Sequence, residues 1–134
     1  MTYFPDLSPY AYDPLPGFEG RLILNVGWLS FQHPFYRRGW TSRAFRLELR
    51  RLCEDTTIRH RGYHHCSLDL CVLLGFVSGD GIVVTRSGSS WFAAPSLVYH
   101  YVRWHLYRPP DDFIESVLST AQPPSGPAGV QPCC

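Results

Sequence analysis

The sequence predicts an α+β domain in which a small antiparallel sheet of about four strands is packed by about three helices. Short apolar runs between Gly- and Ser-rich turns predict hairpins, a helical apolar period predicts an amphipathic helix, and aromatic residues at 15% of the chain favour a globular fold. At 134 residues the chain can bury a core of its own. We expect one globular domain over residues 1–119 and a disordered Pro- and Gly-rich tail over residues 120–134.

Residues 1–20 predict an extended N-terminal arm, because four prolines are interspersed there with several Tyr and Phe residues. The aromatic rings are expected to hold this arm against the sheet. The segment lacks the basic region and the apolar run of a signal peptide, and no stretch of the chain is apolar for long enough to span a membrane. We therefore expect a soluble, cytoplasmic protein without membrane contacts, whose five cysteines are thiols or metal ligands.

The first strand and the first helix follow this arm. The segment LILNVGWL, residues 22–29, predicts a strand, and a loop follows as far as residue 40. Thr41 or Ser42 caps a helix that ends near Asp55. One apolar stripe along this helix consists of Phe45, Leu49, Leu52 and Cys53.

The apolar run at residues 68–77 predicts the central strand, because both of its alternating faces are apolar. Turns at 78–81 and 87–90 separate it from strands expected at 82–86 and 91–94. Hairpin therefore follows hairpin, and we expect an antiparallel meander.

Two more helices are expected after the meander. Pro95 suits the first position of a helix that runs to about Tyr107, where Pro109 and Pro110 end it. Two aspartates then favour the positive end of a last helix at residues 112–119.

All twelve basic residues are arginine, and the net charge of +1 gives no general attraction to nucleic acid or membranes. Eight of these arginines lie between Arg37 and Arg61, and three share the helix face opposite the apolar stripe. Arginine with aromatic neighbours can bind phosphates and stack bases, although a solvated charged face is the commoner cause of this pattern. The candidate nucleic-acid contacts are Arg43, Arg46 and Arg50.

The stretch HRGYHHCSLDLC, residues 60–71, concentrates histidine and cysteine just before the apolar run. Structural zinc sites take Cys and His ligands, commonly in two pairs. Cys66 and Cys71 form one widely spaced pair, and YHYVRWHLY supplies two further histidines. Zinc is the one cofactor that the sequence suggests, and its candidate ligands are His64, His65, Cys66, Cys71, His100 and His105.

The spacing of His100 and His105 limits this site. On a regular helix, residues five positions apart lie about 140° apart around the axis. Only one of the two is therefore expected to face an ion, with His64 or His65 as the remaining ligand.

The spacing of the two cysteines limits the site in a similar way. If a strand begins at Leu68, Cys66 and Cys71 project from opposite faces, unless the chain turns near residues 67–69. In the alternative interpretation no metal binds, Cys71 is a small core residue and the histidines form local hydrogen bonds.

A Cys/His enzyme is a second interpretation. Cys66 could act as a thiolate beside His65, because a protonated histidine and Arg61 would lower the pKa of the thiol. Side chains of sequence neighbours seldom face each other, however, and no orienting acid is evident. The sequence therefore favours a protein that is not an enzyme.

Several motifs recur in a recognisable order: RG-x-H-x-C, a Gly-rich hairpin, an aromatic-Ala-x-Pro turn and HY-V-x-x-H-x-Y-x-PP-x-x-F. Their positions here are Arg61-Gly62, His64, Cys66, 79–82, 92–95, His100-Tyr101, His105, Tyr107, Pro109-Pro110 and Phe113. This pattern, over most of residues 2–118, resembles a family of small uncharacterised bacterial proteins with no assigned activity. The resemblance implies a C-x-x-C pair in typical members, where this chain has Cys66-x4-Cys71.

Together these features predict a small binding or interaction protein with a structural zinc site and an unidentified protein as its partner. The Cys/His enzyme and the arginine-faced nucleic-acid binder remain the alternatives.

Overall fold

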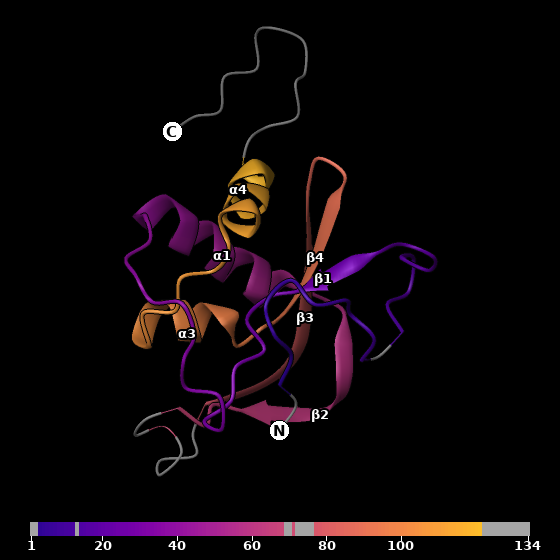
Figure 1. Ribbon diagram of the computed structural model, residues 1–134. Coiled ribbons are helices and arrows are strands. Elements are labelled where there is room, and N and C mark those ends of the chain that lie inside the picture. The colour runs from indigo at the N-terminus through magenta and orange to yellow at the C-terminus, as the bar shows by residue number, and fades with distance from the viewer. Residues whose placement is uncertain (1–2, 13, 69–70, 72–76, 122–134) are drawn as a thin grey trace, which may run out of the picture.

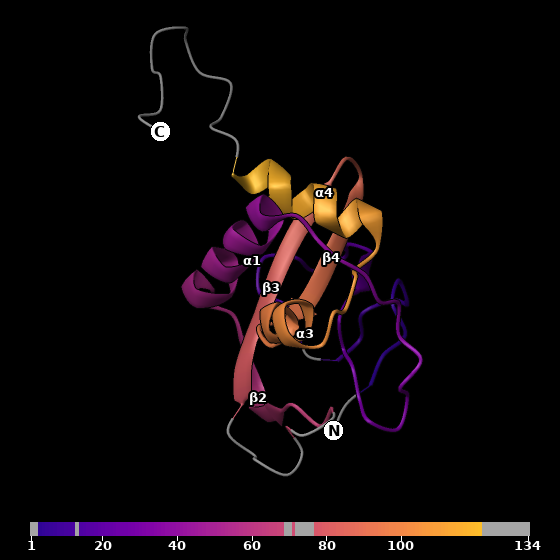
Figure 2. The same cartoon turned by 90° about the vertical axis from the view of Figure 1, so that its left-hand side faces the viewer.

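Three helices lie on one face of a small β-sheet in the computed structural model of the chain (Figure 1). In chain order the elements are β1 (Ile23–Asn25), α1 (Arg43–Asp55), β2 (Arg59–His65), β3 (Ser78–Ser87), β4 (Ser90–Pro95), α3 (Val98–Trp104) and α4 (Asp111–Thr120). The structure describes residues 3–12, 14–68, 71 and 77–121, with residues 60–64 described by their backbone alone. From the side, all three helices stand in front of β3 and β4 (Figure 2). The predicted α+β class is confirmed.

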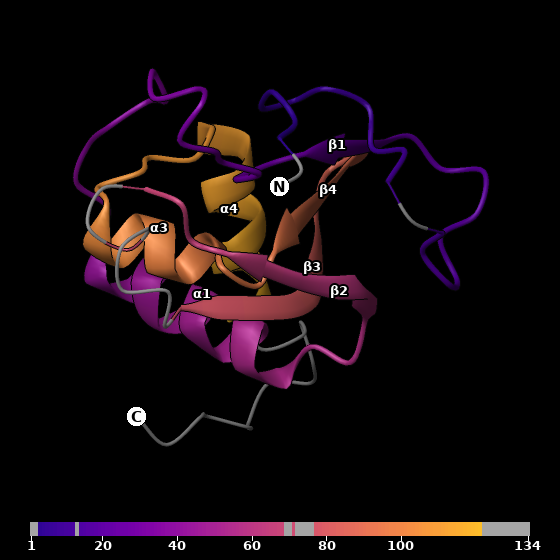
Figure 3. The ribbon, with the colours of Figure 1, turned by 90° about the horizontal axis from the view of Figure 1, so that it is seen from below.

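The sheet is mixed rather than wholly antiparallel. β4 pairs antiparallel with β3 and parallel with β1, so these three strands form a continuous sheet. β2 runs along the other edge of β3, where its antiparallel pairing is irregular between Arg59 and His64 (Figure 3). The expectation of an antiparallel sheet is wrong for β1, which pairs parallel with β4. A parallel pair needs a long connection, and here α1, β2 and β3 lie between the two strands in the chain.

The expected central strand at 68–77 lies largely outside the described residues, which omit 69–70 and 72–76. At its beginning the chain turns, because the N–H of Cys71 donates to the carbonyl of Leu68 at 3.0 Å. The His-rich stretch just before it forms β2.

Gly79 and Gly81 lie inside β3 and do not form the turn expected at 78–81. Close packing explains Gly81: a Cβ atom there would lie only 2.8 Å from the Arg59 guanidinium and 3.1 Å from Cβ of Ser96. The turn expected at 87–90 is confirmed, and Gly88 supplies its positive φ of 61°.

Local sequence signals place α1 and α4 correctly. The Ser42 hydroxyl accepts the N–H of Phe45 at 3.1 Å, so this residue caps α1 as predicted. The helix then buries Phe45 and Leu49 against the other helices. α4 begins one residue before the expected position, at Asp111, and ends at Thr120.

α3 begins at Val98, later than the predicted start at Pro95. Pro95 is the last residue of β4 and lies opposite Ile82 of β3. A proline is tolerated at a strand end, where its missing N–H removes little of the ladder. Pro95 therefore ends a strand and does not begin a helix.

Alternate side chains of β4 enter two hydrophobic cores. Phe92 belongs to the core beneath the helices, where its ring meets that of Phe113 edge-on at 6.0 Å. Ala93 belongs to the second core, which is centred on Trp28. The rings of Phe4 and Tyr12, from the N-terminal segment, pack on Trp28 at 5.6 and 5.8 Å.

The N-terminal segment follows β1, because the N–H of Tyr10 donates to the carbonyl of Ile23 at 2.7 Å. It is less extended than expected, with turns at 6–7 and 16–17. The tail expected at 120–134 lies, from residue 122 onward, outside the described residues.

Glu48 links α1 to α4 and gives the first prediction. Its carboxylate accepts the Arg51 guanidinium Nε at 2.9 Å and the Thr120 hydroxyl at 2.7 Å. The Arg51 hydrogen bond lowers the pKa of Glu48 below its ordinary value. A carboxyl group whose pKa is lower in the folded protein stabilises the fold at pH values above its ordinary pKa. This stabilisation is lost as the pH falls through the lower pKa of the folded state.

We therefore expect Glu48→Gln to lower the free energy of unfolding by about 1 kcal/mol at pH 7 and by progressively less below about pH 4.5. Urea denaturation of both proteins across this pH range measures the difference. A difference in unfolding free energy that stays constant from pH 7 to pH 3 would contradict this role of the Glu48 carboxylate.

Candidate metal centre

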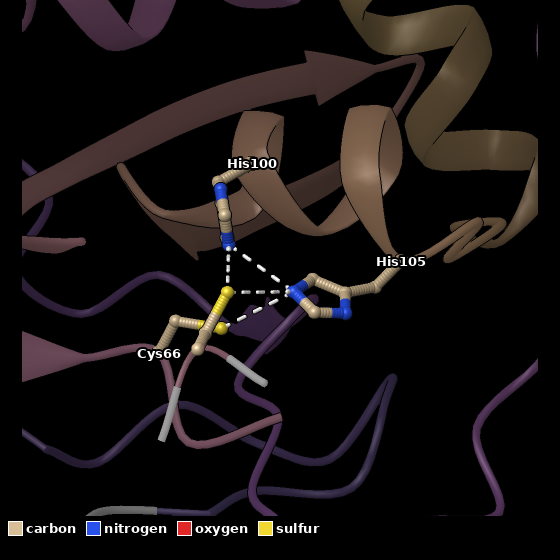
Figure 4. Close-up of side chains that lie close together, drawn as sticks. Cys66, His100 and His105 are labelled. Atoms are coloured by element: carbon tan, nitrogen blue, oxygen red, sulfur yellow. Dashed lines mark hydrogen bonds between the residues drawn. The ribbon is translucent and has the colours of Figure 1, made fainter. Parts of the chain in front are cut away.

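Two cysteines and two histidines from distant parts of the chain meet beside α3. The described residues Cys66, Cys71, His100 and His105 each offer one ligand atom, and all four atoms lie within 4.8 Å of one another. Cys66 approaches from the segment after β2, whereas both imidazoles come from α3 and its end (Figure 4). Cys66 and His105 are buried, and the other two side chains are half-buried.

Backbone hydrogen bonds position the two cysteines. The N–H of Cys66 donates to the carbonyl of Val77 at 2.9 Å, and the turn from Leu68 brings Cys71 back toward Cys66. Between them, the hydroxyl of Ser67 accepts the N–H of Phe31 at 3.1 Å. The condition under which the two cysteines would project to opposite faces is not met, because the chain turns after Leu68, which is the alternative that the sequence left open.

Both histidines face the site, which corrects the expectation that only one could. α3 ends at Trp104, and His105 leaves the helix with φ −117° and ψ 11°. Its imidazole therefore turns back toward that of His100, and their Nε2 atoms lie 3.2 Å apart. The angle expected from regular helical spacing does not apply, because His105 is the C-cap residue of α3 and not part of its regular turns.

The end of α3 is closed by a residue in the left-handed conformation. Leu106 has a φ of 53°, and the N–H of Tyr107 donates to the carbonyl of Tyr101 at 3.1 Å. The N–H of His105 donates to the same carbonyl at 3.0 Å. A left-handed residue just after the C-cap is common at helix ends, where glycine usually takes the position.

Four of the six distances between the donor atoms match a tetrahedral zinc site, and the other two are within 4.8 Å. With Zn–S near 2.3 Å and Zn–N near 2.05 Å, an ideal tetrahedron has N–N edges of about 3.3 Å and N–S edges of about 3.6 Å. The Nε2–Nε2 distance is 3.2 Å, and the Cys66 sulfur lies 3.4 Å from Nε2 of His105. The Cys71 sulfur lies 3.5 Å from Nε2 of both histidines. A zinc-sized ion therefore fits between the four atoms.

The electrostatics of the site suit neutral imidazole ligands. Burial, together with the nearby His105, lowers the pKa of His100 to about 4. The ring is therefore neutral near pH 7, and its nitrogen lone pair is available to a metal. Two thiolates and two imidazoles form a set of soft and borderline donors that favours zinc over magnesium or calcium.

The other predicted ligands lie elsewhere or outside the description. His65 is exposed and is not among the residues that the structure gathers at the site. The side chain of His64 falls outside the described part of the chain. The structure does not pair Cys66 with His65, because Cys66 is buried while its neighbour is exposed; the imidazole beside its sulfur is that of His105, at 3.4 Å.

The three arginines proposed for nucleic-acid binding lie in α1, but they do not form one open basic face. Arg50 pairs with Glu54 at 2.9 Å, and the guanidinium of Arg46 donates to the backbone carbonyl of Thr41. Arg43 is exposed. Nucleic-acid binding through these residues stays a prediction.

No helix in the described part of the chain has the length and apolar character needed to cross a membrane. No curated protein sequence and no solved structure matches the chain. One family model does match, over residues 2–118, and its description is a domain of unknown function, DUF7919. This match covers most of the sequence, including all four residues of the candidate metal centre. The chain therefore belongs to the DUF7919 family.

Proposed function

We propose that this chain is a small interaction protein whose fold is held together by a structural zinc ion bound to Cys66, Cys71, His100 and His105. The observation that carries the proposal is the cluster of four donor atoms, in which four of the six edges have the lengths of a zinc tetrahedron and all lie within 4.8 Å. These donors come from two segments that are well separated in the chain, so the ion would act as a cross-link.

A structural role follows from the number of ligands. Catalytic zinc sites keep one position for water or substrate, whereas four protein ligands fill the tetrahedron. The buried Cys66 and His105 further limit access of a substrate to the ion. When bound, zinc would form two bonds to the turn after β2 and two bonds to the end of α3, and would so hold these segments together.

Such a cross-link would add stability that the residues of α3 do not supply alone. α3 is only seven residues long, and a helix of that length is unstable in water without tertiary contacts. Leu106, in an unfavourable left-handed conformation, follows immediately. A zinc ion on both histidines would stabilise this helix end.

Exposed aromatic side chains support an interaction role. Phe35 is fully exposed, Trp40 is 81% exposed and Trp104 is 65% exposed. Large aromatic residues are enriched where proteins meet partners. They stand outside both hydrophobic cores, so folding does not account for them.

Metal analysis tests the proposal. Protein purified without added zinc or chelator is expected to contain about one zinc ion per chain, and chelation is expected to lower its melting temperature. Cys71→Ser should lose the metal, whereas His65→Ala should keep it, since His65 is an exposed neighbour of Cys66. A metal-to-chain ratio near zero, with melting unchanged by chelation, would overturn the proposal.

A further inference from the structure

A small groove lies between the loop that leads into α1 and the C-terminal end of α3. It encloses about 220 Å³, and its walls include Trp40, Thr41, Arg46, Arg103 and Leu106. We call it the Trp40 groove. These five residues take no part in the metal centre or in either hydrophobic core, whereas Val102, which also lines the groove, belongs to the helix core.

We propose that the Trp40 groove docks an acidic segment of a partner protein, with a carboxylate between the two guanidiniums and an apolar side chain against Trp40 and Leu106. The inference deepens the interaction role proposed above and rests on it. Its basis is the charge of the groove, the exposure of its apolar walls and the rigidity of its frame.

The groove carries positive charge without a counter-charge of its own. Its lining holds two arginines and no acidic residue. Among the described residues neither Arg46 nor Arg103 forms an ion pair, whereas Arg50 and Arg51 are paired with acids on α1. A guanidinium matches a carboxylate through two parallel hydrogen bonds, so this pair is suited to an acidic side chain.

Apolar surface flanks these charges. Trp40 is 81% exposed and Leu106 is 39% exposed. The guanidinium of Arg103 stacks 4.3 Å from the ring centroid of Trp104, which is itself 65% exposed. An interface whose charged contacts lie beside exposed aromatic anchors has the composition of a protein-binding site.

Hydrogen bonds fix the walls of the groove before any partner binds. The N–H of Gly39 donates to the carbonyl of Leu106 at 2.9 Å, and the Arg108 guanidinium donates to the carbonyl of Trp40 at 2.6 Å. On the other wall, Arg46 donates to the carbonyl of Thr41. A site that is ordered in advance loses less entropy on binding.

A protein segment fits this surface better than a nucleic acid does. Single-stranded nucleic acid binds along an extended basic track with successive stacking platforms. Here the adjacent arginines of α1, Arg50 and Arg51, are already neutralised by Glu54 and Glu48, and the net charge is only +1. Arg46 and Arg103 place two charges at one pocket of about 220 Å³, which suits a single carboxylate better than a run of phosphates.

Peptide binding tests the inference. The probe is a fluorescein-labelled synthetic peptide of alternating Asp and Leu residues, titrated with the full chain at low salt and followed by fluorescence anisotropy. We expect saturable binding that Arg103→Glu and Arg46→Glu each weaken at least about tenfold. Arg86→Glu is the matched control, because Arg86 also stacks on a tryptophan, at 5.2 Å from Trp91, but lies in the β3–β4 hairpin. This variant should bind within about twofold of the unchanged protein.

Three results would overturn the inference. One is the absence of binding at low salt, and another is equal weakening by the Arg86 and Arg103 variants. The third is tighter binding of a labelled oligothymidylate that displaces the peptide, which would make the groove a nucleic-acid site.

Zinc content, measured on every variant, separates this inference from the proposal of a zinc-stabilised fold. Full zinc content without peptide binding overturns the docking site alone. Peptide binding that depends on Arg103, in a protein without zinc, overturns the metal centre alone.

Discussion

Cys66→Ser is expected to abolish stoichiometric zinc binding and to lower the free energy of unfolding by at least about 3 kcal/mol. The sulfur of Cys66 is buried and lies 3.4 Å from Nε2 of His105. A serine hydroxyl in its place is a poor zinc ligand, and the three remaining donors would bind the ion far more weakly. Loss of the ion would release the turn after β2 from the end of α3, and urea denaturation with parallel metal analysis measures both effects.

Cys53→Ser is the matched control for this experiment. Cys53 is a half-buried thiol of α1 that packs at the edge of the helix core, and it is not part of the metal centre. Burial raises the pKa of Cys53 to about 12, so the thiol stays protonated at neutral pH and is a poor ligand. This variant should keep about one zinc ion per chain and lose only about 1 kcal/mol. Equal zinc content and equal stability in the Cys66 and Cys53 variants would count against the metal centre.

Trp28→Ala is expected to lower the free energy of unfolding by about 3–5 kcal/mol. Trp28 is 1% exposed, and the rings of Phe4, Tyr10 and Tyr12 lie within 6.3 Å of its ring. Its removal would leave a cavity between β1 and the N-terminal segment, and the aromatic rings of that segment would lose their contacts with the indole. Circular dichroism during urea denaturation of the zinc-loaded protein measures this loss.

Two further variants calibrate the effect. Trp28→Phe keeps an aromatic ring and loses the hydrogen bond from the indole N–H to the carbonyl of Ala93, at 3.1 Å. That carbonyl still accepts the N–H of Val26 at 3.0 Å, so we expect this variant to be destabilised less than the alanine variant. Phe35→Ala, at a fully exposed ring, should change stability by less than about 0.5 kcal/mol. The account fails if Trp28→Ala costs no more than Phe35→Ala.

Local signals explain which parts of the fold could be predicted. Ser42 and the apolar stripe that begins at Phe45 are sequence neighbours, so α1 was predictable from its cap and its period. The parallel pairing of β1 with β4 joins Ile23 to Trp91, and no local pattern signals a contact so distant in the chain. Pro95 misled the prediction because proline suits both a strand end and a helix start.

The candidate metal centre was predictable in composition but not in geometry. All four residues that the structure brings together were among the candidate ligands. The objection to His100 and His105 assumed a regular helix, whereas the helix ends one residue before His105. A glycine after this histidine would have indicated such an end, but Leu106 occupies the left-handed position and gives no signal.

The Trp40 groove shows a different limit. The arginine-rich segment marks Arg46 as a candidate contact in the sequence, but no motif marks Arg103. It lies far along the chain and joins Arg46 because α3 packs against α1 and the N–H of Gly39 is bonded to the carbonyl of Leu106. Surface sites of this kind depend on tertiary contacts that residue spacing does not record.

X-ray absorption at the zinc edge tests the central claim most directly, because it counts and identifies the atoms around the metal. For zinc that copurifies with the unmodified chain, we expect two sulfur atoms at about 2.3 Å and two nitrogen atoms at about 2.0–2.1 Å. This shell corresponds to Cys66, Cys71, His100 and His105. A first shell without sulfur, or one made of oxygen and nitrogen in six-fold coordination, would contradict the account.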